Sequence, residues 1–362
     1  MMEKKIRVCH ICNLGMNGKA IFLCNLLENI DYSKYDITIL DYRAECAEPV
    51  MNRLEKLPVE IIKPDNKSLR SFMKLLKNYL NSNSVDVIHS HIWDLSGLFL
   101  YVARKKGVSI RVCHSHNTSK APGRYGRIKE FIRDKVLWNI LRFMIQTNAN
   151  RFVACSEEAA KWLYTDKIID MGKHSIIKYG IDFSTFSPGS NNSSEIEILF
   201  AGRFIYQKNP LFAIRVFSEY HKLNPKSHLT MIGKGTMERE IKELIMDLGL
   251  QTFVTLIPES SEMQVYYRKS NIFLFPSYYE GFGIVLIEAQ ACGLKCLTSD
   301  NVPASTQCGL VKYLSLELGY KEWACELDSM LHTNMYLDND ALECYNIKEC
   351  VKQVDKLYGV MS

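Results

Sequence analysis

The segment from Tyr279 to Gly293 combines glycines and carboxylates in a pattern that could bind a ligand. Gly281 and Gly283 allow close backbone approach, and a helix starting there would direct free amide groups and a positive dipole end toward an anion. Glu288 follows in an apolar stretch, where a buried carboxylate needs a partner. The paired hydroxyls of a ribose would provide one. The structural alternative is a bond to a neighbouring backbone group or lysine.

A second group of candidate residues lies between Gly202 and Pro210. Arg203 can hold phosphate oxygens through two parallel N–H groups, and Lys208 adds a compact positive charge. By itself this would be an ordinary basic loop. Together with the segment of glycines and carboxylates, it indicates a binding site for a diphosphate.

Both segments directly follow predicted strands in an alternating pattern of strands and helices. Such alternation predicts parallel sheets covered by helices on both faces, in which ligands bind beyond the carboxyl ends of the strands. The predicted strands are 6–12, 35–40, 59–62, 85–89, 111–114, 152–155, 197–201, 229–233, 254–258 and 272–276, and the predicted helices are 20–30, 69–80, 95–106 and 209–221, the last one capped by Asn209 and opened by Pro210.

The length of 362 residues exceeds the usual span of one hydrophobic core. The polar, turn-forming stretch 187–194 has the composition of a domain boundary. We therefore expect an α/β protein with two doubly wound domains, residues 1–187 and 188–345. Residues 346–362 are expected to form a C-terminal helix that returns to the N-terminal domain.

Composition places the chain among ordinary globular proteins, with 47% hydrophobic and 23% charged residues. No stretch approaches the ~20 apolar residues of a membrane span, and the first residues lack a signal-peptide core. We therefore expect a cytoplasmic protein. The 12 cysteines are scattered through predicted strands and helices, so most should be reduced core thiols.

Charge is distributed unevenly along the chain. Residues 1–188 hold 29 Lys and Arg against 19 Asp and Glu, whereas the remainder holds 16 against 21. The densest basic segment is 120–142, where aromatic and aliphatic residues lie between the cations. This pattern fits a helix lying on an anionic membrane surface, and it fits a solvated helix face equally well. Nucleic acid is disfavoured because no recognised reading motif accompanies the charge.

The motifs together resemble glycosyltransferase family 4, the retaining enzymes of GT-B fold. The resemblance rests on Gly202-Arg203 with Lys208, on Gly233-Lys-Gly235, and on Glu280-Gly-Phe-Gly with Glu288. In the N-terminal half, the motifs beginning at Asp86, His114 and Cys155 resemble the branch that builds exopolysaccharides and capsules. The resemblance runs from about residue 6 to the C-terminus, and the two glutamates in their glycine context are its most specific part.

The resemblance implies a role for each matching residue. Arg203 and Lys208 would bind the diphosphate of a nucleotide-sugar donor, probed first as a UDP-sugar, and Glu288 would bind its ribose. Glu280 would bind hydroxyls of the donor sugar, with His116 beside that sugar, and these two are the candidate catalytic residues. The acceptor would be a saccharide or a polyprenyl-linked saccharide. The remaining expected donor contacts are Gly18, Gly233, Gly281, Phe282 and Gly283.

The first loop departs from the family pattern, which often has Gly-Gly-x-Glu where this chain has Asn17-Gly-Lys-Ala20. The missing glutamate puts an acceptor role of this loop in question, and Lys19 could contact phosphate instead. Two alternative functions follow. One is a nucleotide-sugar epimerase of the same fold, and the other is a non-catalytic protein that binds a nucleotide sugar.

No metal cofactor is expected, because GT-B enzymes usually need none. The Asp-x-Asp sequence at Asp338 to Asp340 lies in a polar segment that has the composition of a surface turn. The pair Cys9 and Cys12 has zinc-like spacing but lacks a second pair at zinc-finger distance, which favours core packing. His89, His91 and His114 end two neighbouring strands and would suit a metal site, although hydrogen-bonded core imidazoles are a simpler interpretation of one or more of them.

Overall fold

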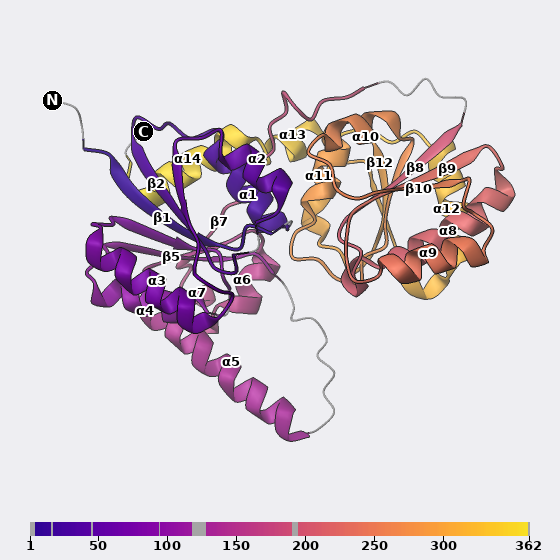
Figure 1. Ribbon diagram of the computed structural model, residues 1–362. Coiled ribbons are helices and arrows are strands. Elements are labelled where there is room, and N and C mark those ends of the chain that lie inside the picture. The colour runs from indigo at the N-terminus through magenta and orange to yellow at the C-terminus, as the bar shows by residue number, and fades with distance from the viewer. Residues whose placement is uncertain are drawn as a thin grey trace. The chain divides into compact units, whose positions relative to one another are not determined.

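The computed structural model describes residues 4–15, 17–44, 46–93, 95–117, 128–189 and 195–360, with the backbone alone over 128–135. The chain forms two compact units (Figure 1). Unit 1 comprises Met1–Gly180 and Ile347–Ser362, and unit 2 comprises Ile181–Asn346. The change of unit at Gly180 precedes the boundary expected at residues 187 and 188. The polar stretch that suggested the later boundary begins inside unit 2.

Unit 1 is built on a seven-stranded parallel sheet with the order β3-β2-β1-β4-β5-β6-β7. Its helices include α14, which comes from the C-terminus of the chain. The strands are β1 Ile6–Cys12, β2 Tyr35–Asp41, β3 Val59–Ile62, β4 Val87–Ser90, β5 Ile110–Ser115, β6 Arg151–Ala154 and β7 His174–Ile176. The helices are α1 Gly18–Leu27, α2 Glu48–Leu54, α3 Leu69–Ser82, α4 Ser96–Lys105, α5 Ile128–Asn148, α6 Glu157–Leu163, α7 Asp166–Asp170 and α14 Ile347–Tyr358.

Unit 2 is built on a six-stranded parallel sheet with the order β10-β9-β8-β11-β12-β13. The strands are β8 Ile196–Ala201, β9 Ser227–Ile232, β10 Val254–Ile257, β11 Ile272–Phe275, β12 Lys295–Ser299 and β13 Val311–Leu314. The helices are α8 Pro210–Leu223, α9 Glu238–Asp247, α10 Met263–Lys269, α11 Ile284–Ala291, α12 Tyr320–His332 and α13 Asn339–Glu343, with short 3₁₀ turns η1 Tyr206–Lys208, η2 Ala304–Thr306 and η3 Leu316–Leu318.

Burial on both faces explains why the strands of unit 2 read as continuous apolar runs. Successive residues of β8 enter different clusters, since Ile198 and Phe200 pack with residues of α8, α9 and α12, while Leu199 and Ala201 pack with residues of α10 and α11. The same alternation holds along β11. The sheet of unit 2 is therefore the middle of three layers, and the ends of its strands are left for function.

The strand order reverses direction between β1 and β4 in unit 1, and between β8 and β11 in unit 2. A crevice opens at such a switch point, beyond the carboxyl ends of the two strands. In unit 2 the loops at this position are the two segments that carry the predicted diphosphate and sugar contacts. The fold thus brings both candidate segments to the same edge of the sheet.

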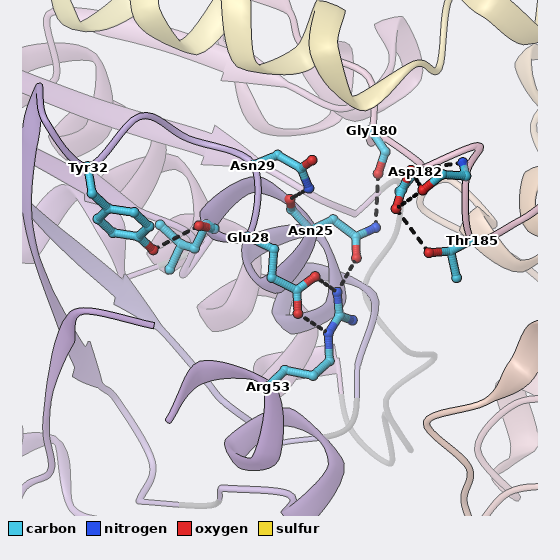
Figure 2. Close-up of polar contacts among 10 residues, drawn as sticks. Asn25, Glu28, Asn29, Tyr32, Arg53, Gly180, Asp182 and Thr185 are labelled. Atoms are coloured by element: carbon cyan, nitrogen blue, oxygen red, sulfur yellow. Dashed lines mark hydrogen bonds and ion pairs between the residues drawn. The ribbon is translucent and has the colours of Figure 1, made fainter. Parts of the chain in front are cut away.

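The end of unit 1 is anchored by α1 and α2, as Figure 2 shows. Asn25 donates from Nδ2 to the carbonyl of Gly180 at 2.9 Å, and its Oδ1 accepts from Arg53 at 2.7 Å. Arg53 also binds both carboxylate oxygens of Glu28 at 2.7 and 2.5 Å. The last residue of the main part of unit 1 is therefore tied to the first helix of the chain.

Helix α14 belongs to unit 1 although it lies at the end of the sequence. Tyr35 of β2 donates to Asp355 at 2.6 Å, and Lys34 lies 3.6 Å from the same carboxylate. Tyr358 at the last turn of α14 is buried and reaches His89 of β4 at 2.6 Å. The helix therefore contacts several strands of the N-terminal sheet.

Asn209 behaves differently from the expected helix cap. It adopts a left-handed conformation with φ of 55°, its side chain makes no capping bond to α8, and its buried Nδ2 has no hydrogen-bond partner. Asparagine tolerates this conformation better than most residues. Pro210 does open the helix, as expected.

Candidate functional site

The candidate site in unit 2 is formed by the loops that follow β8 and β11. Gln207 donates from Nε2 to the carbonyl of Tyr279 at 2.9 Å, and the amide of Tyr278 donates to the carbonyl of Gln207 at 2.9 Å. The rings of Tyr206 and Tyr278 stack with centroids 4.6 Å apart. These contacts hold the basic loop and the glutamate loop together as one structure.

Lys208 and Glu280 form the central contact of this site. The Nζ atom of Lys208 lies 2.6 Å from Oε1 of Glu280, and the two side chains are only 14% and 7% exposed. Lys208 also lies over the ring of Phe275, with Nζ 4.7 Å from its centroid. Burial lowers the pKa of Lys208, while the carboxylate of Glu280 opposes that shift. The residues predicted to bind diphosphate and sugar are therefore neighbours.

Arg203 lies in the same loop as Lys208 and is exposed. Its positive charge also acts to lower the pKa of Lys208. Both cations lie in the segment that follows β8 at the carboxyl edge of the sheet, where they would attract a polyanion. This is the electrostatic character that a diphosphate site requires.

Gly233 has a structural role that the sequence interpretation missed. A Cβ atom added there would lie 2.0 Å from the carbonyl oxygen of Gly202. The amide of Gly202 also donates to Ile232 and that of Phe204 to Lys234, at 2.9 and 2.8 Å. The loop after β9 thus supports the loop after β8 through backbone contact, which positions Arg203.

Gly281, Phe282 and Gly283 lead from β11 into α11. Gly283 is the N-cap residue of α11 and has φ of 89°, a conformation that favours glycine. The side chain of Phe282 is buried, with its ring centroid 5.7 Å from that of Tyr345, so any donor contact of this residue falls to its backbone. The amino end of α11 follows directly, with no acidic residue in its first turn.

Glu288 lies in α11 and is 6% exposed. The hydroxyl of Tyr267 on α10 donates to Oε2 of Glu288 at 3.0 Å. The buried carboxylate therefore has a protein partner, as the structural alternative required, although that partner is a tyrosine rather than a lysine or backbone group. A carboxylate can accept several hydrogen bonds, so this contact is compatible with ribose binding.

The first loop of unit 1 leads into α1, with Asn17 as the N-cap. The Asn17 side chain accepts from the amide of Ala20 at 3.1 Å. Gly18 is exposed as the first helical residue, and a Cβ atom there would meet Tyr179 at an ordinary 3.7 Å. Asn17 therefore supplies the helix cap in the segment that departs from the family pattern.

His116 follows β5 and is 5% exposed. Its Nδ1 lies 2.5 Å from the hydroxyl of Tyr179, and its Nε2 lies 2.9 Å from Nδ1 of His91. Both ring nitrogens are therefore engaged inside unit 1. The imidazole would have to release one of these partners in order to bond to a sugar.

His116 belongs to a cluster of five buried imidazoles. Burial lowers the pKa of His10 and His114 to about 3, and that of the other three well below the usual value. All five rings are therefore neutral at neutral pH. The sequence left His89, His91 and His114 open as metal ligands or as hydrogen-bonded core imidazoles, and it gave no sign that His10 joins them. The members are His10, His89, His91, His114 and His116.

Other features set aside from the sequence have local roles. All 12 cysteines are free thiols, and Cys9 and Cys12 are buried in β1. Asp338 is the N-cap of α13, and its side chain accepts from the amide of Ala341 at 3.0 Å, so this segment starts a short helix where a turn was expected.

Helix α5 carries the described part of the basic segment. Four apolar side chains on one face are at least 50% exposed: Val136, Leu137, Ile140 and Phe143. Arg142 donates instead to the carbonyls of Leu163 and Tyr164, so its charge serves a structural purpose. Residues 120–127 lie outside the described residues, as do the side chains of 128–135. None of the described helices is both long and apolar enough to span a bilayer.

Two family models match consecutive parts of the chain. The model described as Glycosyltransferase Family 4 matches residues 16–185, and the one described as glycosyl transferases group 1 matches residues 183–308. Their junction falls close to the division between units 1 and 2. The predicted donor residues Arg203, Lys208, Glu280 and Glu288 all lie in the second match.

Curated relatives carry glycosyltransferase names. A Bacillus subtilis (strain 168) protein named as the glycosyltransferase EpsF is 29% identical over 344 residues, covering 90% of this chain and 87% of its own. The capsular polysaccharide biosynthesis glycosyltransferase CapH of Staphylococcus aureus is 25% identical, covering 79% of each chain.

Solved glycosyltransferase structures share the two-unit GT-B fold. Anabaena HepE in complex with UDP and glucose has a TM-score of 0.76 at 13% identity, with 98% of this chain and 100% of that chain covered. Sucrose-phosphate synthase from Thermosynechococcus elongatus has a TM-score of 0.77 at 19% identity, with 98% of each chain covered. At these identities the similarity concerns the fold.

Proposed function

We propose that this chain, a glycosyltransferase with the GT-B fold, transfers a sugar from a UDP-sugar with retention of anomeric configuration. The acceptor we propose is a saccharide or a lipid-linked saccharide used to build a cell-surface polysaccharide. The names of EpsF and CapH support the glycosyltransferase class, and CapH supports the polysaccharide context. The complex of HepE with UDP and glucose makes UDP-sugars the first donors to examine.

The observation that carries the donor site is the contact between Lys208 and Glu280 beside Arg203. An ammonium has three N–H donors, so its bond to Glu280 leaves capacity for phosphate oxygens. Arg203 can bind the same diphosphate through two N–H groups. Glu280 would bind the sugar while its partner Lys208 binds the diphosphate. Recognition of the sugar would therefore be coupled to stabilisation of the leaving group.

In this reaction the protein must chiefly stabilise the negative charge that develops on the leaving phosphate. Arg203, Lys208 and the free amides at the start of α11 would stabilise that charge without reorganising during the reaction. We propose front-face transfer, in which the acceptor proton moves to the departing diphosphate oxygen as the new glycosidic bond forms. Glu280 is proposed to orient the sugar.

We propose that these groups take the place of Mg²⁺ or Mn²⁺ at the diphosphate. Adding either ion to enzyme in metal-depleted buffer should then leave the transfer rate unchanged. A rate that rises in proportion to added Mg²⁺ or Mn²⁺, together with metal-dependent donor binding, would contradict this part of the proposal.

The function is tested by a calorimetric screen of nucleotide sugars, followed by incubation of the bound donor with and without saccharide acceptors. We expect transfer only when an acceptor is present, and NMR of the product should show the anomeric configuration of the donor. Interconversion of the sugar without acceptor would identify an epimerase. Donor binding without turnover on any acceptor would identify a non-catalytic binding protein.

Arg203→Ala provides the matched test of the donor site. Loss of a charged hydrogen bond should cost about 1.5 to 3 kcal/mol, which is roughly tenfold or more in donor affinity. Lys222→Ala is the control, because this exposed lysine on α8 pairs with Glu219 outside the site loops. Equal donor affinity in both variants would remove Arg203 from the site.

We further propose that α5 of unit 1 rests on an anionic membrane. Its exposed apolar face consists of Val136, Leu137, Ile140 and Phe143. The excess of Lys and Arg in the first half of the chain complements anionic headgroups. Such a surface would suit a lipid-linked acceptor.

A further inference from the structure

The five imidazoles of unit 1 lie at the carboxyl end of three neighbouring strands. His10 on β1 pairs in register with His89 on β4, and His114 lies on β5, the next strand. His91 and His116 come two residues after His89 and His114, so the alternation of side chains along a strand places them on the same face. The rings of His89 and His91 stack at 4.3 Å, and those of His114 and His116 at 4.0 Å.

Three of these rings, those of His91, His114 and His116, form a trio that could hold a metal ion. Each of the three has one nitrogen in contact with a group outside the trio. The outer contact of His91 is its Nε2, 3.1 Å from Nδ1 of His10. For His114 it is Nδ1, 3.1 Å from Nε2 of His89, and for His116 it is Nδ1, 2.5 Å from the hydroxyl of Tyr179. If each outer nitrogen carries the proton and donates it, all three rings are neutral with a lone pair on the other nitrogen.

Two of the remaining nitrogens of the trio lie close together. Nδ1 of His91 and Nε2 of His116 lie 2.9 Å apart, and Nε2 of His114 is buried without a hydrogen-bond partner. The three residues each offer a ring nitrogen within 4.8 Å of those of the other two. A buried polar atom without a partner is costly, and here it belongs to a set of potential metal ligands.

We propose that unit 1 binds one divalent transition-metal ion of the zinc class through Nδ1 of His91, Nε2 of His114 and Nε2 of His116. Zinc binds imidazole nitrogens at about 2.0 to 2.1 Å, and three histidines with one open position form a known type of site. Tetrahedral angles at that bond length separate the nitrogens by roughly 3.4 Å, so the 2.9 Å between the nitrogens of His91 and His116 would have to widen slightly. The stacked rings of His114 and His116 would have to turn relative to each other to direct both lone pairs at one ion.

The outer contacts provide the second shell of this site. Histidine ligands usually donate their other ring N–H to an acceptor, which fixes the tautomer and the ring orientation. His10, His89 and Tyr179 supply those acceptors. The proton arrangement continues without conflict, because His89 accepts at Nε2 and can donate from Nδ1 to the hydroxyl of Tyr358, 2.6 Å away.

The ligand set also selects the kind of ion. Neutral imidazoles suit zinc, cobalt, nickel and copper, whereas Mg²⁺ and Ca²⁺ prefer oxygen ligands. This site belongs to unit 1, while the proposed diphosphate contacts Arg203 and Lys208 belong to unit 2. The inference rests on contacts within unit 1 and does not depend on the proposed transfer activity.

Metal analysis of the full chain without a polyhistidine tag tests the proposal. We expect about one zinc per chain after exhaustive dialysis, measured by elemental mass spectrometry. Apoprotein titrated with Co²⁺ should develop the visible absorption of a four- or five-coordinate site, saturating at one equivalent. Folded wild-type protein that retains no metal and gives no cobalt absorption would overturn the proposal.

Three substitutions locate the site. His114→Ala should reduce Co²⁺ affinity by more than about a hundredfold, and His10→Ala, which removes only an outer acceptor, by about 10- to 100-fold. His332→Ala is the control, since this exposed histidine of α12 belongs to unit 2. Circular dichroism verifies that each variant is folded. If His114→Ala does not fold, the metal content and cobalt absorption of the wild-type protein decide whether the proposal holds. Metal retained equally by a folded His114→Ala would also overturn the assignment.

Discussion

Lys208 is a buried ammonium whose partner, Glu280, is itself a predicted ligand-binding group. A buried ion pair contributes little net stability, yet loss of one partner leaves an uncompensated charge in a poorly solvated place. Substitutions at either residue therefore affect folding and donor binding together. Removing both charges separates the two effects.

We predict that Lys208→Met and Glu280→Gln each lower the free energy of unfolding. The loss should reach about 3 to 5 kcal/mol in Glu280→Gln, where the buried ammonium of Lys208 loses its carboxylate. The double variant Lys208→Met with Glu280→Leu should recover most of that loss, because no buried charge remains. It should nevertheless bind donor poorly. Denaturant unfolding and donor calorimetry on the three variants measure this, and a stable double variant with wild-type donor affinity would refute the assigned roles.

Glu288 and Tyr267 form a second buried pair with a different expected outcome. Glu288→Ala should weaken donor binding roughly tenfold or more, because a charged hydrogen bond to ribose is lost. Tyr267→Phe keeps the carboxylate and should chiefly reduce stability, by about 1 to 3 kcal/mol, since the buried carboxylate loses the hydrogen bond from this hydroxyl. Donor calorimetry and thermal unfolding distinguish the two. Equal donor affinity in Glu288→Ala and wild type would favour a purely structural glutamate.

At the scale of elements, the site depends on loops that support one another. The loop after β9 contacts the loop after β8 through backbone atoms at Gly233, and the loop after β11 is bonded to the same loop through Gln207. The central loop, which carries Arg203 and Lys208, is therefore held on both sides. A change at the supporting Gly233, which is itself an expected donor contact, should also affect donor binding by moving the loop that carries Arg203.

We predict that Gly233→Ala weakens donor binding and lowers the free energy of unfolding. The added Cβ atom would lie 2.0 Å from the carbonyl oxygen of Gly202, so this carbonyl would have to move. Overpacking of this kind typically costs about 1 to 3 kcal/mol. Gly249→Ala is the matched control, since it has a positive φ of 67° but no atom within 4 Å of the added Cβ. That control should lose about 1 kcal/mol of stability and keep its donor affinity. Identical donor affinity in both variants would show that loop packing does not position Arg203.

On the scale of the whole molecule, the two units differ in the kind of partner they can accept. Unit 2 presents the predicted diphosphate contacts, whereas unit 1 carries α5 with an exposed apolar face. In Figure 1 the amino-terminal half of α5 extends beyond the other helices of unit 1. A surface of this type suits association with lipid, as proposed above.

We predict that the protein sediments with vesicles containing anionic lipid and is released as salt rises. Each basic group near such a surface contributes about 1 kcal/mol, and salt screening shortens the Debye length to roughly 3 Å at 1 M. Leu137→Glu with Phe143→Glu should abolish sedimentation by placing charges on the exposed face of α5. Changing Arg124, Arg127 and Arg133 to Glu should weaken it through loss of attraction.

The control for this experiment is Met246→Glu, which alters an exposed apolar residue of unit 2. It should sediment as the wild type does. If wild type, the α5 variants and the control all sediment equally, the apolar face of α5 does not contact lipid.

The sequence alone determined the alternating architecture and the position of the candidate loops. Predicted strands 6–12 and 59–62 match β1 and β3 at both ends, and the other predicted strands overlap their observed counterparts. The reason is local, because strands buried on both faces require continuous apolar runs and the ligand loops of parallel sheets follow the strands directly. Arg203, Lys208, Glu280 and Glu288 could be selected on this basis together with the family resemblance.

Only the tertiary structure decided which of these residues meet. Lys208 and Glu280 are 72 positions apart, Tyr267 reaches Glu288 from another helix, and the imidazole cluster draws on three strands. Such contacts depend on strand order and register, since a one-residue shift in a strand would turn its side chains to the opposite face. The change of unit at Gly180 likewise follows from long-range packing, because the bond from Asn25 to Gly180 joins residues that no local pattern connects.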